Sequence, residues 1–213
     1  MKRALLLTIL VGCSSNAGTP VNEQVMYGGV FKTSQMRLAD QEFVAAAKRD
    51  FSTPRAASDH YADLGWAFIR RGDLRTAIRR FNQCWLLDES NPTCFWGFGT
   101  FEQQQSHTGK AIEYLEKAQG MMPSASVDLS VDLATTYAQK SQEPASDPAL
   151  PGQLMDKANA LFQRASAAEP DNQKVPCVWA MVLLQTHDTR RACQVVDRCK
   201  DDRDGVRKQL TCP

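Results

Sequence analysis

Residues 58–91 read SDHYADLGWAFIRRGDLRTAIRRFNQCWLLDESN, and residues 92–125, which follow directly, read PTCFWGFGTFEQQQSHTGKAIEYLEKAQGMMPSA. The apolar and small residues of these two stretches recur 34 positions apart. The matched pairs are Tyr61 and Phe95, Leu64 and Phe98, Gly65 and Gly99, Ala77 and Ala111, Phe81 and Leu115, and Cys84 and Ala118. Self-similarity at this period predicts supersecondary units that stack one on the next, because each unit buries an apolar face that it cannot bury alone.

The order of residues within each stretch resembles the tetratricopeptide repeat (TPR), a helix–turn–helix unit. Small residues such as Gly65 and Ala77 let two antiparallel helices approach closely, while large residues fill the space around them. The resemblance implies an all-α fold, a TPR superhelical solenoid of about four repeats. Two positions depart from the TPR pattern: Glu102 stands where an aromatic residue is usual, and Glu89 replaces a terminal proline.

Two further repeats follow from the same register. Ala158 and Phe162 match Ala192 and Val196, again 34 positions on. The third repeat needs an insertion, residues 142–153, whose proline-containing pairs favour a loop and oppose a continuing helix.

Upstream of the repeats, Ala39, Phe43 and Ala46 recur at helical spacing and predict an amphipathic helix that caps the first repeat. The preceding Ser-, Gly-, Asn- and Thr-rich residues predict a flexible tether. The expected segments are a signal peptide (1–12), the tether (13–33), an N-terminal helix (34–57), repeats at 58–91, 92–125, 126–172 and 173–206, and a tail (207–213).

The charge balance of the chain gives no reason to expect a nucleic-acid partner. The 213 residues include 25 basic and 24 acidic side chains, for a formal net charge of +1. Nucleic-acid-binding domains usually carry a basic patch, whereas pairs such as Arg70-Arg71 are scattered among acids and are typical of solvated helix faces.

The first residues resemble a bacterial lipoprotein signal. Lys2 and Arg3 precede the apolar run of residues 4–11, which is too short to cross a bilayer but typical of a signal-peptide core. The run ends at Leu10-Val11-Gly12-Cys13. This sequence is similar to the lipobox, in which the cysteine is acylated and the chain is cut just before it.

The resemblance implies a covalent lipid on Cys13 and no other cofactor. The protein would be anchored to the membrane without spanning it. Ser14 after the cysteine favours the outer membrane, with the protein facing the periplasm. The alternatives are an ordinary signal peptide or a cytosolic helix with an incidental cysteine.

Apart from Cys13, the chain has six cysteines: Cys84, Cys94, Cys177, Cys193, Cys199 and Cys212. An even number favours disulfides in an exported protein. The TPR register sets Cys84, late in one helix, close to Cys94, which begins the next, and we expect these two to be joined. No C-x-x-C pair exists, so a zinc site is not expected. Buried thiols are the alternative if the protein is cytosolic.

In the fourth repeat, antiparallel packing suggests a bridge between Cys177 and Cys199, which leaves Cys193 and Cys212. The other pairing joins Cys199 to Cys212, by analogy with the first bridge.

No catalytic constellation is visible. His60, His107 and His187 fall at a helix start and in inter-helix turns, without partners at motif spacing. The sequence lacks G-x-S-x-G, H-E-x-x-H and glycine-rich phosphate-loop motifs. We therefore expect neither an enzyme nor a metal site.

Binding is the favoured activity, because the first helices of TPRs line a concave groove. The register assigns to this groove Asp59, Ala62, Trp66, Ile69, Arg70, Thr93, Trp96, Thr100, Gln103, Asp128, Val131, Thr135, Gln139, Lys174, Cys177 and Met181. Trp66 and Trp96 beside amide and hydroxyl groups suit an extended or helical peptide. In the alternative interpretation both tryptophans belong to the core. Ala62 and Trp66 stand where carboxylate-clamp TPRs have polar residues, so a terminal-carboxylate clamp is not expected.

The sequence thus predicts a lipid-anchored scaffold or adaptor that binds a protein or peptide partner during envelope or secretion-machinery assembly. The other hypotheses are a permanent structural subunit of an envelope machine and an accessory subunit of a cell-wall enzyme. No small-molecule substrate is expected.

Overall fold

The described chain folds into a row of helices. The computed structural model describes residues 18–124, 126–200, 205–210 and 212, and within these residues it contains helices and no strand. The helices are η1 (Val21–Glu23), η2 (Val25–Gly29), α1 (Ser34–Asp50), α2 (Pro54–Arg70), α3 (Leu74–Leu87), α4 (Pro92–Gln104), α5 (Thr108–Met121), α6 (Val127–Ser141), α7 (Leu150–Ala168), α8 (Lys174–Gln185), α9 (Thr189–Val196) and α10 (Val206–Gln209).

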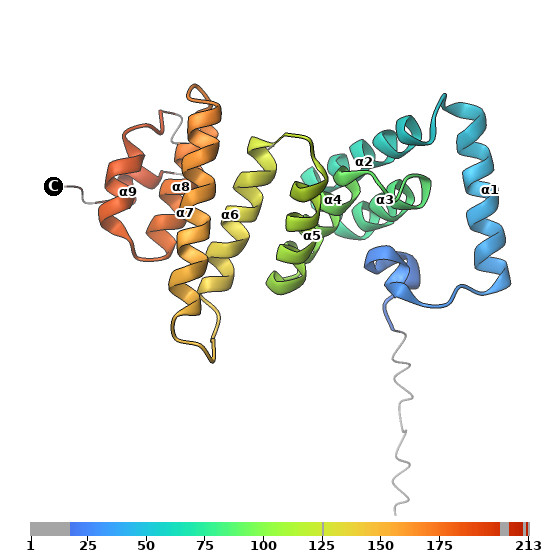
Figure 1. Ribbon diagram of the computed structural model, residues 1–213, viewed down its shortest axis with the longest axis horizontal. Coiled ribbons are helices and arrows are strands. Elements are labelled where there is room, and N and C mark those ends of the chain that lie inside the picture. The colour runs from blue at the N-terminus through green and yellow to red at the C-terminus, as the bar shows by residue number, and fades with distance from the viewer. Residues whose placement is uncertain (1–17, 125, 201–204, 211, 213) are drawn as a thin grey trace, which may run out of the picture.

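Helices α2 to α9 form four pairs that stack side by side (Figure 1). The pairs are α2 with α3, α4 with α5, α6 with α7, and α8 with α9. The first helix of each pair, here called helix A, also contacts helix A of the next pair. These contacts join the four helices A into one face, as in a solenoid of helical hairpins.

Local signals fix where the helices begin and turn. Thr53 accepts a hydrogen bond from the backbone of Ala56 at the start of α2, and Pro54 follows it in the first turn. In the turns between the two helices of the first pair and of the second pair, Gly72 and Ser106 adopt left-handed backbone angles, with φ of 74° and 61°. These residues lie 34 positions apart, so the turn repeats with the sequence.

The phenyl ring of Phe81 packs between the first two repeats. Phe81 on α3 is fully buried, with 0% of its surface exposed. A Cβ atom added at Gly65 of its own repeat, or at Gly97 of the next, would overlap this ring. Helices α2, α3 and α4 can approach this closely because both positions lack a side chain.

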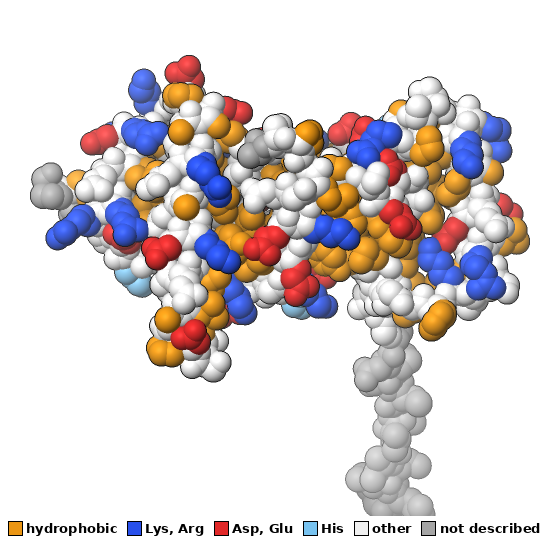
Figure 2. Space-filling view, viewed as in Figure 1, with side chains coloured by type: hydrophobic (Ala, Val, Ile, Leu, Met, Phe, Trp, Pro, Cys, Tyr) orange, Lys and Arg blue, Asp and Glu red, His pale blue; other side chains and the backbone are white. Residues whose placement is uncertain are grey.

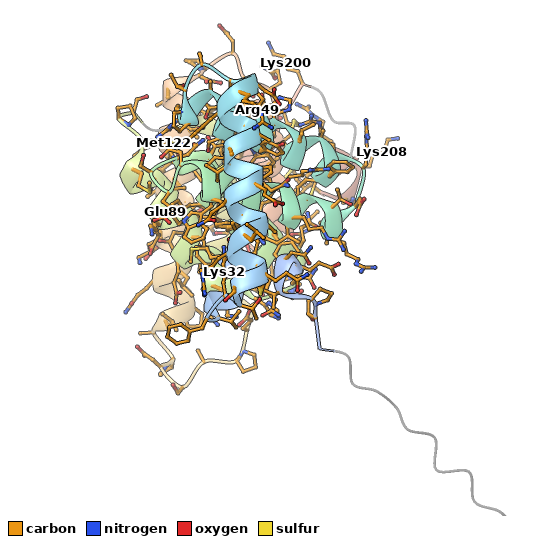
Figure 3. The ribbon with its side chains drawn as sticks, turned by 90° about the vertical axis from the view of Figure 1, so that its right-hand side faces the viewer. Lys32, Arg49, Glu89, Met122, Lys200 and Lys208 are labelled. Carbon is orange, nitrogen blue, oxygen red and sulfur yellow. A yellow bond between two sulfur atoms is a disulfide. The ribbon has the colours of Figure 1, made fainter. Side chains whose placement is uncertain are left out.

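Helix α1 lies across the end of the helix row, as Figure 3 shows in a view along that row. Its Phe43 meets Tyr61 of α2 edge to face, with ring centroids 5.1 Å apart. Within the segment expected for the N-terminal helix (34–57), α1 runs from Ser34 to Asp50, and α2 already begins at Pro54.

The N-terminal segment, residues 19–29, differs from the expected flexible tether. Glu23 is 7% exposed and accepts bidentate hydrogen bonds of 2.9 and 3.0 Å from Arg75, with a further bond from Arg79. Asn82 Nδ2 donates to the backbone oxygens of Asn22 and Gln24 at 3.1 and 2.8 Å. The described part of the expected tether is therefore held on α3.

The signal peptide (1–12) and the lipidation residue Cys13 lie outside the described residues. Within the part of the chain that is described, no helix combines the length and the apolar character needed to cross a bilayer.

The insertion in the third repeat is shorter than expected. We predicted a loop over 142–153, but α7 starts at Leu150 and takes Pro151 into its first turn, where proline is well accommodated. The loop that remains projects at one end of the α6–α7 pair (Figure 1). In the expected tail, residues up to Gln209 form the end of α10.

Three disulfides lie among the described residues. They join Cys84 to Cys94, Cys177 to Cys199 and Cys193 to Cys212. The first connects α3 with α4 across the junction between repeats, the second joins the start of α8 to Cys199 after α9, and the third joins Cys212 to α9.

The packing around Phe81 predicts a contrast between two glycines. Gly97→Ala should lower the free energy of unfolding by about 1–3 kcal/mol, the usual cost of overpacking a core. Gly120→Ala lies at an open position of α5 and should raise it by about 0.5–1 kcal/mol, because alanine favours helix. Urea unfolding followed by circular dichroism measures both, and equal effects of the two substitutions would contradict the interlock.

Candidate functional site

The residues predicted to line the groove all fall on the four helices A. Trp66, Ile69 and Arg70 lie on α2, Trp96, Thr100 and Gln103 on α4, Thr135 and Gln139 on α6, and Met181 on α8. Each helix A contacts the next, and Trp66 meets Trp96 and Gln103 meets Gln139 across these contacts. The row of helices A is called the A face below. Their exposure differs: Arg70 and Gln139 are exposed, Thr100 is buried, and the other residues just named are intermediate. Ala62, Val131 and Cys177 were also predicted to face the groove, but they are buried in the core.

The two tryptophans meet. The ring centroids of Trp66 and Trp96 lie 4.9 Å apart at an interplanar angle of 65°. Trp66 also packs against Phe81, at 5.3 Å between centroids. Both indoles are partly buried, so each contributes to the core and to the surface of the A face at once. Such an aromatic pair, fixed on one side and open on the other, is a preorganised contact surface.

Asp132 joins this pair from the next repeat, and the sequence analysis missed it. Trp96 Nε1 donates to Asp132 Oδ2 at 2.8 Å. Burial raises the pKa of the Asp132 carboxyl, and the Trp96 N–H and the charge of Lys174 oppose this shift. Lys174 itself pairs with Asp128 at 2.7 Å. A carboxylate desolvated in this way on a helix surface is a candidate for a functional role.

Some amide and hydroxyl groups on the same face already form hydrogen bonds within the protein. Gln103 Nε2 donates to Gln139 Oε1 at 3.2 Å, which links α4 to α6. The Thr135 hydroxyl donates to the backbone oxygen of Val131 within its own helix at 2.8 Å. Thr100 is only 7% exposed and offers little surface to a partner. Gln139 and Arg70 are therefore the polar predicted residues most open to a ligand.

The A face shows no arrangement suited to metal binding. Across residues 18–124, 126–200, 205–210 and 212, no group of three or more His, Cys, Asp or Glu side chains could hold a metal ion. The six cysteines predicted to form disulfides are paired with one another instead.

Asp132 gives a pH-dependent prediction. Because its pKa is raised in the folded protein, its contribution to stability is largest below the pKa of the unfolded chain and declines as the pH rises through the folded pKa. Asp132→Asn cannot ionise and can still accept the Trp96 N–H. We expect this variant to have a higher Tm than the parent at pH 7, with a gap that narrows toward pH 3. Asp63→Asn, at an exposed position of α2, is the control. Parallel pH profiles for the parent and Asp132→Asn would refute the prediction.

Comparison with known proteins bears on the fold. No family model and no curated protein matches the sequence. Among solved structures, the chain is similar to the crystal structure of a thermophilic TPR protein from Thermus thermophilus, with a TM-score of 0.61 and 14% sequence identity. The match covers 72% of this chain and 79% of that one. Together with the four helix pairs, this likeness shows that the chain has a TPR-like solenoid fold.

Proposed function

We propose that this protein is a scaffold or adaptor that binds a protein or peptide partner along its A face, and that it does so in the bacterial envelope while held to a membrane by a lipid on Cys13. The observation that carries the binding proposal is the Trp66–Trp96 pair with Asp132 at its edge. TPR-like solenoids provide extended surfaces of this kind for protein partners.

The chemistry of the A face favours a partner segment with a particular composition. The open sides of Trp66 and Trp96 offer apolar contact area, which aromatic residues supply at low entropic cost. Asp132 accepts the hydrogen bond of Trp96, and its carboxyl is partly desolvated. A segment that presents an apolar residue beside a Lys or Arg would cover the indoles and pair with this carboxylate.

Two features support an envelope location. The disulfides of the described residues are typical of proteins that fold in oxidising compartments. The residues that end at Cys13 resemble a lipoprotein signal, and a covalent lipid there would supply the anchor.

Site-specific photocrosslinking in cells tests the binding proposal. A benzophenone side chain placed at Gln139, an exposed position of the A face, should give a crosslinked adduct with the partner. The same group at Gln194, exposed on α9, is the control and should give none. Asp132→Asn should reduce the Gln139 adduct severalfold, and because this variant is expected to be at least as stable as the parent, that loss would not reflect unfolding.

The crosslinking pattern also separates the competing functions. A benzophenone at Ala145, in the loop between α6 and α7, reports on contacts outside the A face. Adducts from Ala145 with none from Gln139 would favour a permanent structural subunit and would rule out binding along the A face.

Acyl labelling tests the anchor. Cells given a radiolabelled or alkyne-tagged fatty acid should incorporate it into the parent protein and not into Cys13→Ser, because the thiol is the proposed acceptor. The Cys13→Ser protein should also leave the membrane fraction. Label that persists in Cys13→Ser would sink the lipoprotein proposal and leave the A-face proposal standing.

A further inference from the structure

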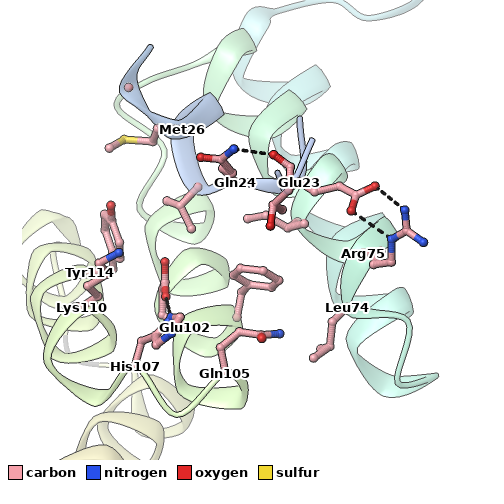
Figure 4. A pocket seen from close by; sticks show the side chains of 16 residues that line it. Glu23, Gln24, Met26, Leu74, Arg75, Glu102, Gln105, His107, Lys110 and Tyr114 are labelled. Atoms are coloured by element: carbon pink, nitrogen blue, oxygen red, sulfur yellow. Dashed lines mark hydrogen bonds and ion pairs between the residues drawn. The ribbon is translucent and has the colours of Figure 1, made fainter. Parts of the chain in front are cut away.

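A pocket of about 830 Å³ lies between the N-terminal segment and the first two helix pairs (Figure 4). Its walls come from residues 19–29, from α3, and from α4 and α5 with the turn that joins them. This volume falls within the range of about 300–1,000 Å³ that is typical of small-molecule sites. The pocket shares no residue with the predicted groove, so it is a separate feature of the fold. Figure 2 shows hydrophobic side chains gathered on this face over α4 and α5, beside the N-terminal segment.

A departure from the repeat pattern lies in the wall of this pocket. In the first repeat Phe68 packs against the core at the end of α2. The matching position in the second repeat, 34 residues on, is Glu102 near the end of α4. A carboxylate side chain is smaller than a phenyl ring, so this position takes up less room beside α4 than Phe68 does beside α2. Ile78 and Phe101 line the pocket, and Val25 and Met26 of the N-terminal segment lie across it.

Glu102 is a buried carboxylate whose hydrogen-bond partner is a histidine, His107, rather than a lysine or arginine. It is 6% exposed, and its Oε2 lies 2.7 Å from His107 Nδ1. Within the part of the chain that the structure describes, no Lys or Arg forms an ion pair with it. Burying a carboxylate without a cation is costly, and proteins usually keep such a group paired. The open side of this pairing is the pocket itself, which Glu102 lines.

Among the described residues, none of the other charged side chains that line the pocket forms an ion pair with Glu102. Arg75 is held by Glu23 of the N-terminal segment, as the dashed lines in Figure 4 show. Lys110 lies exposed at the rim. Burial, with a contribution from the charge of Glu102, raises the pKa of Tyr114, so its hydroxyl stays protonated and can donate a hydrogen bond.

We propose that this pocket binds a small molecule that carries an ammonium group on an apolar body. The ammonium group donates to the Glu102 carboxylate and replaces the missing cation. The apolar body takes the place that Phe68 fills in the first repeat, against Ile78 and Phe101. The N-terminal segment, fastened to α3 through Glu23, forms the remaining wall.

Calorimetric titration of the purified protein with three matched probes tests this assignment. The probes are 4-phenylbutylamine, its neutral analogue 4-phenylbutanol and its anionic analogue 4-phenylbutyrate. The amine should bind at least tenfold more tightly than the alcohol, because only the amine pairs with Glu102. In Glu102→Gln, which keeps the shape and the hydrogen bond to His107, this preference should disappear.

Two further variants separate the pocket from general effects of charge. Glu89→Gln removes an exposed carboxylate elsewhere and should leave the tenfold preference intact. Glu102→Phe restores the aromatic residue of the first repeat, fills the space, and should abolish binding of the amine and the alcohol alike.

Several outcomes would overturn the assignment. They are equal binding of amine and alcohol to the parent, tighter binding of 4-phenylbutyrate through Lys110, no saturable binding of the amine at millimolar concentration, or a preference that survives Glu102→Gln. The amine-to-alcohol ratio in the parent protein stands on its own if a variant fails to fold. None of these results depends on whether a peptide binds the A face.

Discussion

The contact of Phe81 with two glycines is the constraint on which the rest of the solenoid depends. One ring on α3 sets the distance to α2 of its own repeat through Gly65 and to α4 of the next repeat through Gly97. The same ring supports Trp66, which in turn meets Trp96. The geometry of the A face in the first two repeats therefore follows from the packing of the core. Because interiors are close-packed, a change in this distance would be felt at the surface.

Two carboxylates in the central repeats show where stability has been given up. Asp132 on α6 is desolvated beside Trp96, and Glu102 on α4 is buried where the repeat pattern calls for an aromatic residue. The fold does not require a charge at the Glu102 position, because Phe68 shows that an apolar residue serves there in the first repeat. Sites that break a local rule at some cost in stability are where function is expected. These two open onto different surfaces of the molecule.

The sequence predicted the features that depend on short-range periodicity. The spacing of Gly65, Ala77 and Phe81 was enough to place α2 to α5. The register extended from them brought Cys84 close to Cys94 and Cys177 close to Cys199, as the structure joins them, and left Cys193 and Cys212 as the remaining pair. Pro151 was misread as a helix breaker because proline is tolerated in the first turn, a distinction that depends on where α7 begins.

The features that the sequence did not predict rest on contacts between distant segments. Glu23 is buried only because Arg75 and Arg79 stand on one face of α3, and nothing near Glu23 in the sequence signals this. Asp132 was overlooked because its role depends on Trp96, which lies on another helix. Glu102 did carry a signal, its departure from the repeat pattern, but only the structure shows that the departure leaves an opening.

If Cys13 carries a lipid, the ion pairs of Glu23 would also limit how far the solenoid can stand from the membrane. Glu23 lies ten positions after Cys13, and a fully extended chain of that length reaches at most about 35 Å. With a lipid on Cys13, this short linker would keep the first repeat close to the lipid headgroups. The C-terminal repeats, at the far end of the row, would sweep the wider volume. The solenoid would then rotate about its N-terminal end, and the length of the linker would set the distance from the membrane at which it can bind partners.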